Sequence, residues 1–199
     1  MYQPQHFVVS EPARLHALVE QNPLATWVTQ GDGGELVVNH VPFMLDRERG
    51  VLIGHVARAN PVWQKPARSV LVFQGADAYV SPGWYAAKRE HGKVVPTWNY
   101  AVVHAHGTPR AVQERDALRA IVTRLTALHE TGQKVPWAVA DAPADFIEQM
   151  LNAIVGIEMP IERLEGKWKV SQNRSRADRD GVAEALGTHA MAALVRETT

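Results

Sequence analysis

Residues 51–63 (VLIGHVARANPVW) place polar side chains directly after an apolar run. The run opens with bulky and β-branched residues, which favour a buried strand. Gly54 permits a close approach to the backbone, and His55, Arg58 and Asn60 follow before a proline ends the strand. Donors gathered at the end of a buried strand suit an anion such as a ligand phosphate. The alternative is an ordinary strand followed by a solvated arginine, and this stretch alone favours neither.

A histidine and a proline share the second polar stretch, NHVPF at residues 39–43. Pro42 cannot donate to a sheet ladder, so this strand lies at an edge or where a ligand replaces the neighbouring strand. The residues alone favour a rim strand in which His40 is incidental.

The third stretch, VPTWNY at residues 95–100, carries a hydroxyl, an indole, an amide and a phenol in succession. Alternation puts Thr97 and Asn99 on one strand face, and Trp98 and Tyr100 on the other. One face could hydrogen-bond a planar heterocycle while the other packs. The alternative is a β-rich rim with ordinary aromatic residues.

Basic residues mark the fourth stretch, GKWKVSQNR at residues 166–174. Lys167, Lys169 and Ser171 alternate on one face of a predicted strand, and polar residues 172–174 follow at its end. They could form the second half of a site for a phosphate and a ring. The alternative is a basic, solvated hairpin that could also meet DNA.

The sequence gives little support for metal binding, dinucleotide binding or catalysis. His104 and His106 share a strand face, but spacing supplies no third ligand, so we predict no metal site. GDGG at residues 31–34 joins two strands and opens no helix, so it is no dinucleotide fingerprint. No nucleophile–base triad is visible, and we predict no catalytic residue. The nearest candidate for moving protons is His55.

The composition narrows the class of protein. The 199 residues are 46% hydrophobic, enough for one domain with a sizeable core. Basic and acidic residues number 21 each, and zero net charge lowers the expectation of nucleic-acid binding. The absence of cysteine excludes disulfides and thiolate sites. We expect a cytoplasmic protein without membrane association, since no signal peptide or apolar membrane span is visible.

Hydrophobic periodicity predicts about six or seven strands, joined mostly by tight turns, with helices inserted late. The order predicts a mainly β, α+β fold, an antiparallel barrel with peripheral helices, and not a βαβ fold. We expect one domain over residues 1–172 and a helical tail over 173–199 packed on it. The predicted strands are 24–30, 35–46, the apolar run that begins at residue 51, 69–73 extended to 78–80 past a bulge at Gly75, 94–112 broken only by Gly107 and Pro109, 154–164 and 167–171. The predicted helices are 10–22, 113–130, 144–153, 179–186 and 189–196.

Taken together, six stretches resemble the PaiB family of FMN-binding negative transcriptional regulators. They occur in the family's order and span nearly the whole chain. They are MYQPQHF (1–7), NHVPF (39–43), GHVARANPVW (54–63), FQGADAYVSPGWY (73–85), VPTWNY (95–100) and GKWKVSQNR (166–174). One departure is Gly75-Ala76, where the family pattern has Gly-Pro; the turn chemistry changes there, and we expect the site to be unaffected.

The resemblance implies an antiparallel split β-barrel of the FMN-binding type, in which two chains form a homodimer with FMN in the cleft between them. It also implies repression of sporulation and protease genes, a role that does not itself establish contact with DNA. With the polar stretches above, it predicts fourteen cofactor-binding residues. They are His40, Pro42, Phe43, His55, Ala57, Arg58, Asn60, Trp98, Asn99, Tyr100, Lys169, Gln172, Asn173 and Arg174.

Three functions follow as hypotheses. The favoured one is an FMN-binding protein with a regulatory output, which is not itself an enzyme. The second is an FMN-dependent oxidoreductase or a haem-handling enzyme on the same barrel. The third, a repressor that binds DNA directly, is weakened by the neutral charge and by the lack of two short helices joined by a tight turn.

Overall fold

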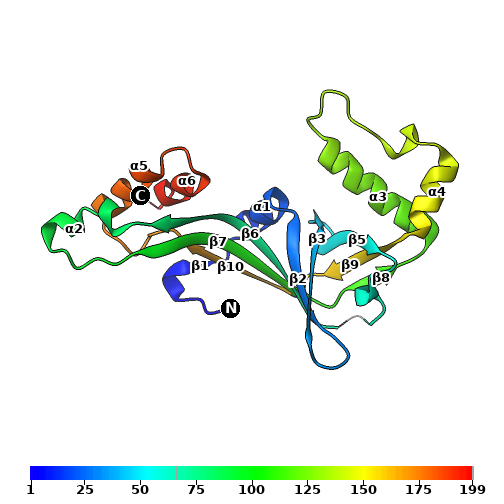
Figure 1. Ribbon diagram of the computed structural model, residues 1–199, viewed down its shortest axis with the longest axis horizontal. Coiled ribbons are helices and arrows are strands. Elements are labelled where there is room, and N and C mark those ends of the chain that lie inside the picture. Colours follow the sequence, from blue (N-terminus) through cyan, green and yellow to red (C-terminus); the bar gives the residue numbers. More distant parts are fainter. Residues whose placement is uncertain (66, 199) are drawn as a thin grey trace. The chain divides into compact units, whose positions relative to one another are not determined.

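Strands make up most of the framework in the computed structural model, which describes residues 1–65 and 67–198 (Figure 1). The chain forms two compact units. The first comprises Met1–Gln21, Gln74–His104 and Glu165–Thr199, and the second comprises Asn22–Phe73 and Ala105–Leu164. Each unit is therefore assembled from segments far apart in the sequence.

The larger sheet has six strands in the order β1-β10-β7-β6-β2-β3. Strands β6, β7 and β10 contribute residues to both units. Every pair whose register is described, β1 with β10, β2 with β3 and β2 with β6, is antiparallel, as the sequence predicted. The bounds are β1 Val8–Val9, β2 Leu24–Gln30, β3 Leu36–Pro42, β6 Ser69–Val80, β7 Thr97–Gly107 and β10 Arg163–Lys169.

The second sheet has four strands in the order β4-β5-β9-β8, paired antiparallel throughout. Strand β5 is central, which agrees with its continuous apolar sequence. The bounds are β4 Met44–Asp46, β5 Val51–Ala57, β8 Arg110–Val112 and β9 Ile154–Pro160.

The predicted hairpin after residue 23 is confirmed. Strands β2 and β3 pair from Leu24 opposite Pro42 to Gln30 opposite Leu36. Gly34 has a φ of 86°, a conformation that glycine adopts without strain, so the glycine-rich turn closes the hairpin. Because β3 ends the sheet order, Pro42 lies on an edge strand, as its missing N–H requires.

In the second unit, helices α3 (Arg115–Glu130) and α4 (Ala144–Asn152) complete the core beside the short helical turns η2 (Pro61–Trp63) and η4 (Val139–Asp141). Ile121 and Leu125 of α3 pack with Val51 and Ile53 of β5 in one buried cluster. A second cluster joins Leu118 of α3 to the apolar residues of α4. The spacing of three and four residues along α3 produces this buried stripe.

In the first unit, α5 (Arg176–Leu186) packs on α6 (Ala190–Arg196) and on the turn η3 (Pro82–Trp84). A Cβ at Gly181 would lie 2.2 Å from the carbonyl oxygen of Trp84, so only glycine allows this contact. No helix in the described part of the chain is long and apolar enough to cross a membrane. The remaining elements are η1 (Gln5–Phe7), α1 (Pro12–Gln21) and α2 (Ala87–Glu90).

Two strand predictions were wrong. We expected a strand over 154–164, a turn at 165–166 and a strand over 167–171, but β9 ends at Pro160 and β10 runs from Arg163 to Lys169. Gly166 is a strand residue opposite Val9, and a Cβ there would lie 2.1 Å from Leu15 Cδ2. This glycine permits close packing inside a strand and makes no turn. In addition, the return strand predicted over 35–46 divides into β3 and β4.

Candidate functional site

The fourteen predicted cofactor residues fall into two groups, one in each unit. The second unit holds His40, Pro42, Phe43, His55, Ala57, Arg58 and Asn60. The first unit holds Trp98, Asn99, Tyr100, Lys169, Gln172, Asn173 and Arg174.

Arg58 follows the end of β5, where its guanidinium holds the end of helix α4. Its Nε donates to the carbonyl oxygen of Asn152 at 2.8 Å, and its two terminal nitrogens donate to the Ile154 carbonyl and to Gln113 Oε1, each at 2.9 Å. A cation at a helix C-terminus also complements the helix dipole. Of the five guanidinium N–H groups, three are used within the described residues and two are left for another acceptor.

Asn60 organises the turn after β5. Its Oδ1 accepts from the backbone N–H of Val62 and so caps η2, while its Nδ2 donates to Asn39 Oδ1 at 2.7 Å. The indole of Trp63 donates to the carbonyl oxygen of Arg58 at 3.1 Å. The amide predicted as a ligand donor therefore also builds the turn that positions Arg58.

His55 is partly buried in β5, and its Nδ1 has no hydrogen-bond partner among the described residues. Burial lowers the pKa of this imidazole below its ordinary value of 6.5, because the charged form loses its hydration. The side chain is therefore neutral at pH 7, with an unsatisfied nitrogen.

The close approach expected at Gly54 is made by the protein itself. A Cβ at Gly54 would lie 2.8 Å from the carbonyl oxygen of Pro42 and 3.0 Å from Phe43 Cδ1. Phe43 is buried in the core, with its ring edge-to-face against Trp27 at 6.2 Å. His40, in contrast, is exposed on edge strand β3.

In the first unit, the side chains of β7 alternate between two faces as predicted. The face that we expected to bind a ligand is packed, and the face that we expected to pack is open. Asn99 is fully buried, and its Nδ2 donates to Ser171 Oγ at 2.8 Å. Its Oδ1 has no hydrogen-bond partner in the part of the chain that the structure describes. Trp98 is 52% exposed on the other face. The polar face that we expected to meet a heterocycle is therefore the packed one, and the aromatic face is open.

The ring of Trp98 is held in place although it is exposed. Its indole N–H donates to Asp77 Oδ1 at 2.8 Å, and Tyr79 packs edge-to-face against it with ring centroids 6.0 Å apart. Beside it lies a hollow of about 400 Å³. Alternate β7 residues form one wall of this hollow, which is lined by Met1, Gln74, Asp77, Trp98, Tyr100, Val102 and His104.

Asp77 and Tyr79 were not among the residues predicted for the site. The signal that could have found them is the alternation in FQGADAYV, which puts residues 77 and 79 on one strand face.

The two lysines of β10 are not on a solvated hairpin. Lys167 is 7% exposed, donates to the carbonyl oxygen of Tyr2 at 2.9 Å, and lies 5.4 Å from the ring centroid of Tyr100. Lys169 donates to Thr97 Oγ1 and to the carbonyl oxygen of Trp98. Burial lowers the pKa of Lys169, and the charges of Lys167 and Arg174 lower it further. A partly desolvated ammonium next to other cations would gain from a bound anion.

The polar residues after β10 make mostly local contacts. Gln172 accepts from the backbone N–H of Val170 and donates to the carbonyl oxygen of Trp168. Arg174 stacks over the ring of Tyr85 at 4.9 Å. Ser171 does not continue the strand face, because its φ of 66° ends the extended conformation.

Comparison with known proteins decides the family. The family described as "Putative FMN-binding domain" matches residues 1–163. This chain belongs to that family. The chain is also 32% identical over 191 residues to "Protease synthase and sporulation protein PAI 2" of Bacillus subtilis strain 168, covering 94% of this chain and 89% of the relative. The PaiB-type relationship predicted from the six stretches is therefore confirmed.

Solved structures confirm the fold. The flavocytochrome Anf3 from Azotobacter vinelandii aligns with a TM-score of 0.63 at 14% identity, covering 82% of this chain and 69% of that one. The "FAD and Heme binding protein" from Mycobacterium smegmatis aligns with a TM-score of 0.56 at 17% identity, covering 81% and 72%. The antiparallel split barrel with peripheral helices, predicted from the sequence, is the fold of this chain.

Proposed function

We propose that this chain binds FMN as a homodimer and has a regulatory output of the PaiB type, the repression of sporulation and protease genes. The observation that carries the proposal is the family match over residues 1–163, supported by the relationship to the Bacillus protein along nearly the whole chain. The FAD, haem and flavocytochrome proteins named above use the same fold, which supports a flavin as the class of cofactor.

The open face of β7 fits the planar ring of a flavin. Trp98 is exposed, yet Asp77 and Tyr79 fix its orientation. An aromatic surface that is already ordered loses little entropy when a flat ring stacks on it. Lys169 adds a cation close to that face through its bond to the carbonyl oxygen of Trp98. Gln172, Asn173 and Arg174 complete the proposed contacts of the first unit, and Asn99 supports β7 from its packed face through the bond to Ser171.

The turn after β5 fits an anion. Arg58 keeps two N–H donors beyond those that hold α4, and a guanidinium binds phosphate oxygens in pairs. We assign the FMN phosphate to Arg58, with His55 and Asn60 in support. His40, Pro42, Phe43 and Ala57 complete the proposed contacts of the second unit.

Titration of FMN, riboflavin and FAD, followed by flavin fluorescence and absorbance, tests the proposal. We expect saturable binding of FMN and poor binding of riboflavin, which lacks the phosphate. Equal affinity for both ligands would remove the phosphate assignment. No binding of any flavin would remove the cofactor proposal itself.

A redox or haem-handling enzyme is the second candidate, favoured by the fold shared with the flavocytochrome and with the FAD and haem binding protein. His55 is partly buried with a free Nδ1, which is also the character of a haem ligand or a proton carrier. Titration with haemin, read from the Soret band, distinguishes this candidate. Tight 1:1 haem binding that His55→Gln abolishes would favour it over the regulator.

The regulatory part of the proposal has its own test. Zero net charge gives little general attraction to phosphate backbones, so we expect weak retention of DNA. A gel shift with DNA from upstream of the protein's own gene, with and without FMN, measures this directly. Specific, salt-resistant retention would show a repressor that binds DNA itself, whereas no shift would place regulation on a partner or on the flavin.

A further inference from the structure

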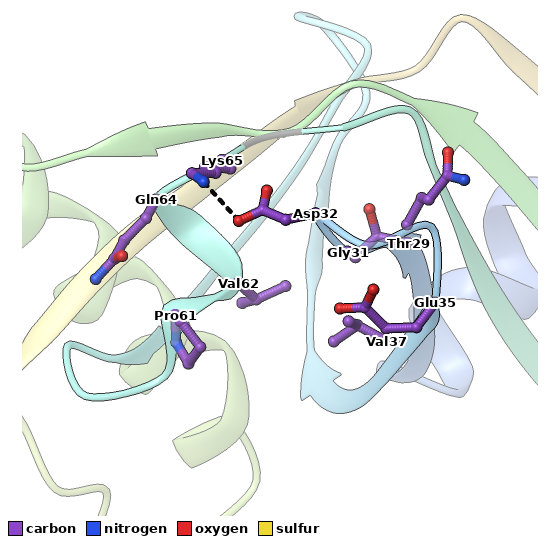
Figure 2. Close-up of a pocket in the computed structure, with 10 residues that line it drawn as sticks. Thr29, Gly31, Asp32, Glu35, Val37, Pro61, Val62, Gln64 and Lys65 are labelled. Carbon is purple, nitrogen blue, oxygen red and sulfur yellow. Dashed lines mark hydrogen bonds and ion pairs between the residues drawn. The ribbon is translucent and has the colours of Figure 1, made fainter.

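A pocket of about 230 Å³ lies between the β2–β3 turn and the helical turn η2, entirely within the second unit (Figure 2). One wall is the hairpin, with Asp32 and Glu35 at its tip. The other wall is Pro61, Val62, Gln64 and Lys65. None of the fourteen residues proposed for FMN lines this pocket, so it is a separate candidate site.

Glu35 brings an unpaired charge to the pocket. Its carboxylate folds back over the turn and points toward the Val62 wall (Figure 2), and it has no hydrogen-bond or ionic partner among the described residues. Glycine makes this possible, because a Cβ at Gly31 would lie 2.0 Å from Glu35 Oε1, and one at Gly33 would lie 2.9 Å from Oε2. The turn therefore leaves open the space that the carboxylate occupies.

Thr29 supplies a second unsatisfied group, in the wall of the same pocket. The residue is only 8% exposed, and its buried hydroxyl has no hydrogen-bond partner within residues 1–65 and 67–198. A buried hydroxyl without a partner is unfavourable, and a ligand that reaches it relieves that loss.

The remaining charges of the pocket cancel. Asp32 forms an ion pair with Lys65, so the carboxylate of Glu35 leaves the lining with one net negative charge. Between the charged groups lie the apolar surfaces of Val37, Pro61 and Val62. The lining thus combines an apolar surface with one free carboxylate and one unpartnered hydroxyl, and the amides of Gln30 and Gln64 complete it.

We propose that this pocket binds a small organic cation, an alkylammonium with a short apolar body and a hydroxyl at its far end. The ammonium pairs with Glu35, the body packs between Val37 and Val62, and the hydroxyl meets Thr29. A divalent metal fits less well, because it prefers several oxygen ligands and one free carboxylate supplies too few.

The probes are n-butylammonium and 4-amino-1-butanol, titrated into the full-length protein and followed by amide chemical shifts. We expect binding in the millimolar range, with the largest shift changes in residues 29–37 and 61–65. Glu35→Gln should weaken both amines about tenfold, because a charge-assisted hydrogen bond becomes a neutral one. Glu48→Gln is the matched control, since Glu48 is exposed in another turn of the same unit and should change nothing.

The hydroxyl contact has a separate test. The amino alcohol should bind more tightly than n-butylammonium to the wild type, and Thr29→Val should remove that preference. Butyrate, which has a similar body and the opposite charge, should not bind. Butyrate binding equal to that of the amines, amine binding indifferent to Glu35→Gln, or shift changes confined to other residues would each overturn the proposal. FMN titration of the same variants keeps the two sites apart, because Glu35→Gln should leave flavin affinity unchanged.

Discussion

The side chain of Arg58 has one structural role and one proposed role, and its replacement must separate the two. Three of its N–H groups donate to the carbonyl oxygens of Asn152 and Ile154 and to Gln113 Oε1, and the other two are assigned to the FMN phosphate. Arg58→Ala should weaken FMN by about one to two decades while leaving the weak riboflavin binding nearly unchanged. Loss of the structural bonds should also lower the free energy of unfolding by about 1–3 kcal/mol. Flavin titration and urea denaturation measure the two effects.

Arg115 provides the matched control. It also holds α4, donating to the carbonyl oxygen of Glu148 and to Asn152 Oδ1, each at 3.0 Å, but it is not among the proposed FMN contacts. Arg115→Ala should destabilise the fold and leave the ratio of FMN to riboflavin affinity as it is in the wild type. If both variants weaken both flavins equally, Arg58 acts only through α4 and the phosphate site lies elsewhere.

His55 makes stability depend on pH. Burial holds its folded-state pKa below 6.5, the ordinary value that applies to the unfolded chain. As the pH falls through 6.5, the unfolded state takes up a proton before the folded state does, so the free energy of unfolding decreases. The decrease stops once the pH is below the folded-state pKa.

The measurement is urea denaturation of wild type and His55→Gln at several pH values from about 8 to about 5, a range that brackets the ordinary histidine pKa. We expect the wild type to lose more stability than the variant across the acidic half of this range. The exposed His91 is the control, and His91→Gln should follow the wild-type curve. Parallel curves for wild type and His55→Gln would mean that the imidazole is not desolvated.

At the scale of elements, the end of β10 combines a strained backbone with a buried hydrogen bond. Ser171 is the residue other than glycine that has a positive φ within the described chain, and its hydroxyl accepts from buried Asn99. Ser171→Ala keeps the strain and removes the partner of a buried amide, which should cost about 1–3 kcal/mol of stability.

Ser171→Gly separates the two contributions. It removes the same hydroxyl but relieves the left-handed backbone by about 1 kcal/mol, so it should be less destabilising than the alanine variant. Chemical denaturation of the three proteins checks the order. A glycine variant as unstable as the alanine variant would show that the backbone at this position stores no strain.

Sequence patterns predicted a strand or a helix well where a single hydrophobic pattern extends over the whole element. The continuous apolar run of β5 and the stripe of α3 were read correctly, because burial on both strand faces or on one helix face fixes the residue types. The pattern failed at Gly166, because a glycine required by a neighbouring side chain looks the same as a glycine in a turn. The same limit applied at Gly54, where the sequence predicted a close approach without indicating that the protein's own Pro42 and Phe43 make it.

For the candidate site, the sequence predicted the types of residue but not the directions in which their side chains point. Alternation correctly separated Trp98 from Asn99, yet nothing local states which face of β7 the rest of the chain covers. The basic stretch of β10 has the composition of a solvated surface, but Lys167 is buried through contacts with Tyr2 and Tyr100, more than 60 residues away in sequence. Composition cannot predict such contacts between segments that are distant in the sequence.

At the scale of the whole molecule, the proposed homodimer needs a surface that favours association. Strand β3 ends the larger sheet, and an edge strand leaves backbone donors and acceptors open to another chain. Its exposed side chains are unusually apolar, with Leu36 at 76% and Val38 at 54% exposure. The edge carries no lysine in β3 that would discourage pairing. We therefore assign this edge to the dimer contact.

Replacing Val38 with lysine tests that assignment, because a charge on the exposed face of an edge strand opposes its burial against a second chain. Wild type should behave as a dimer by light scattering at micromolar concentration with FMN present, and Val38→Lys should raise the dissociation constant about tenfold or more. Val135→Lys is the matched control. Val135 is 86% exposed elsewhere in the same unit, so its replacement should leave association unchanged.

FMN affinity should fall with Val38→Lys only at concentrations where the dimer separates, since the proposed cleft belongs to two chains. A variant that stays dimeric moves the contact to another surface, while a monomeric variant that keeps full FMN affinity removes the shared cleft altogether.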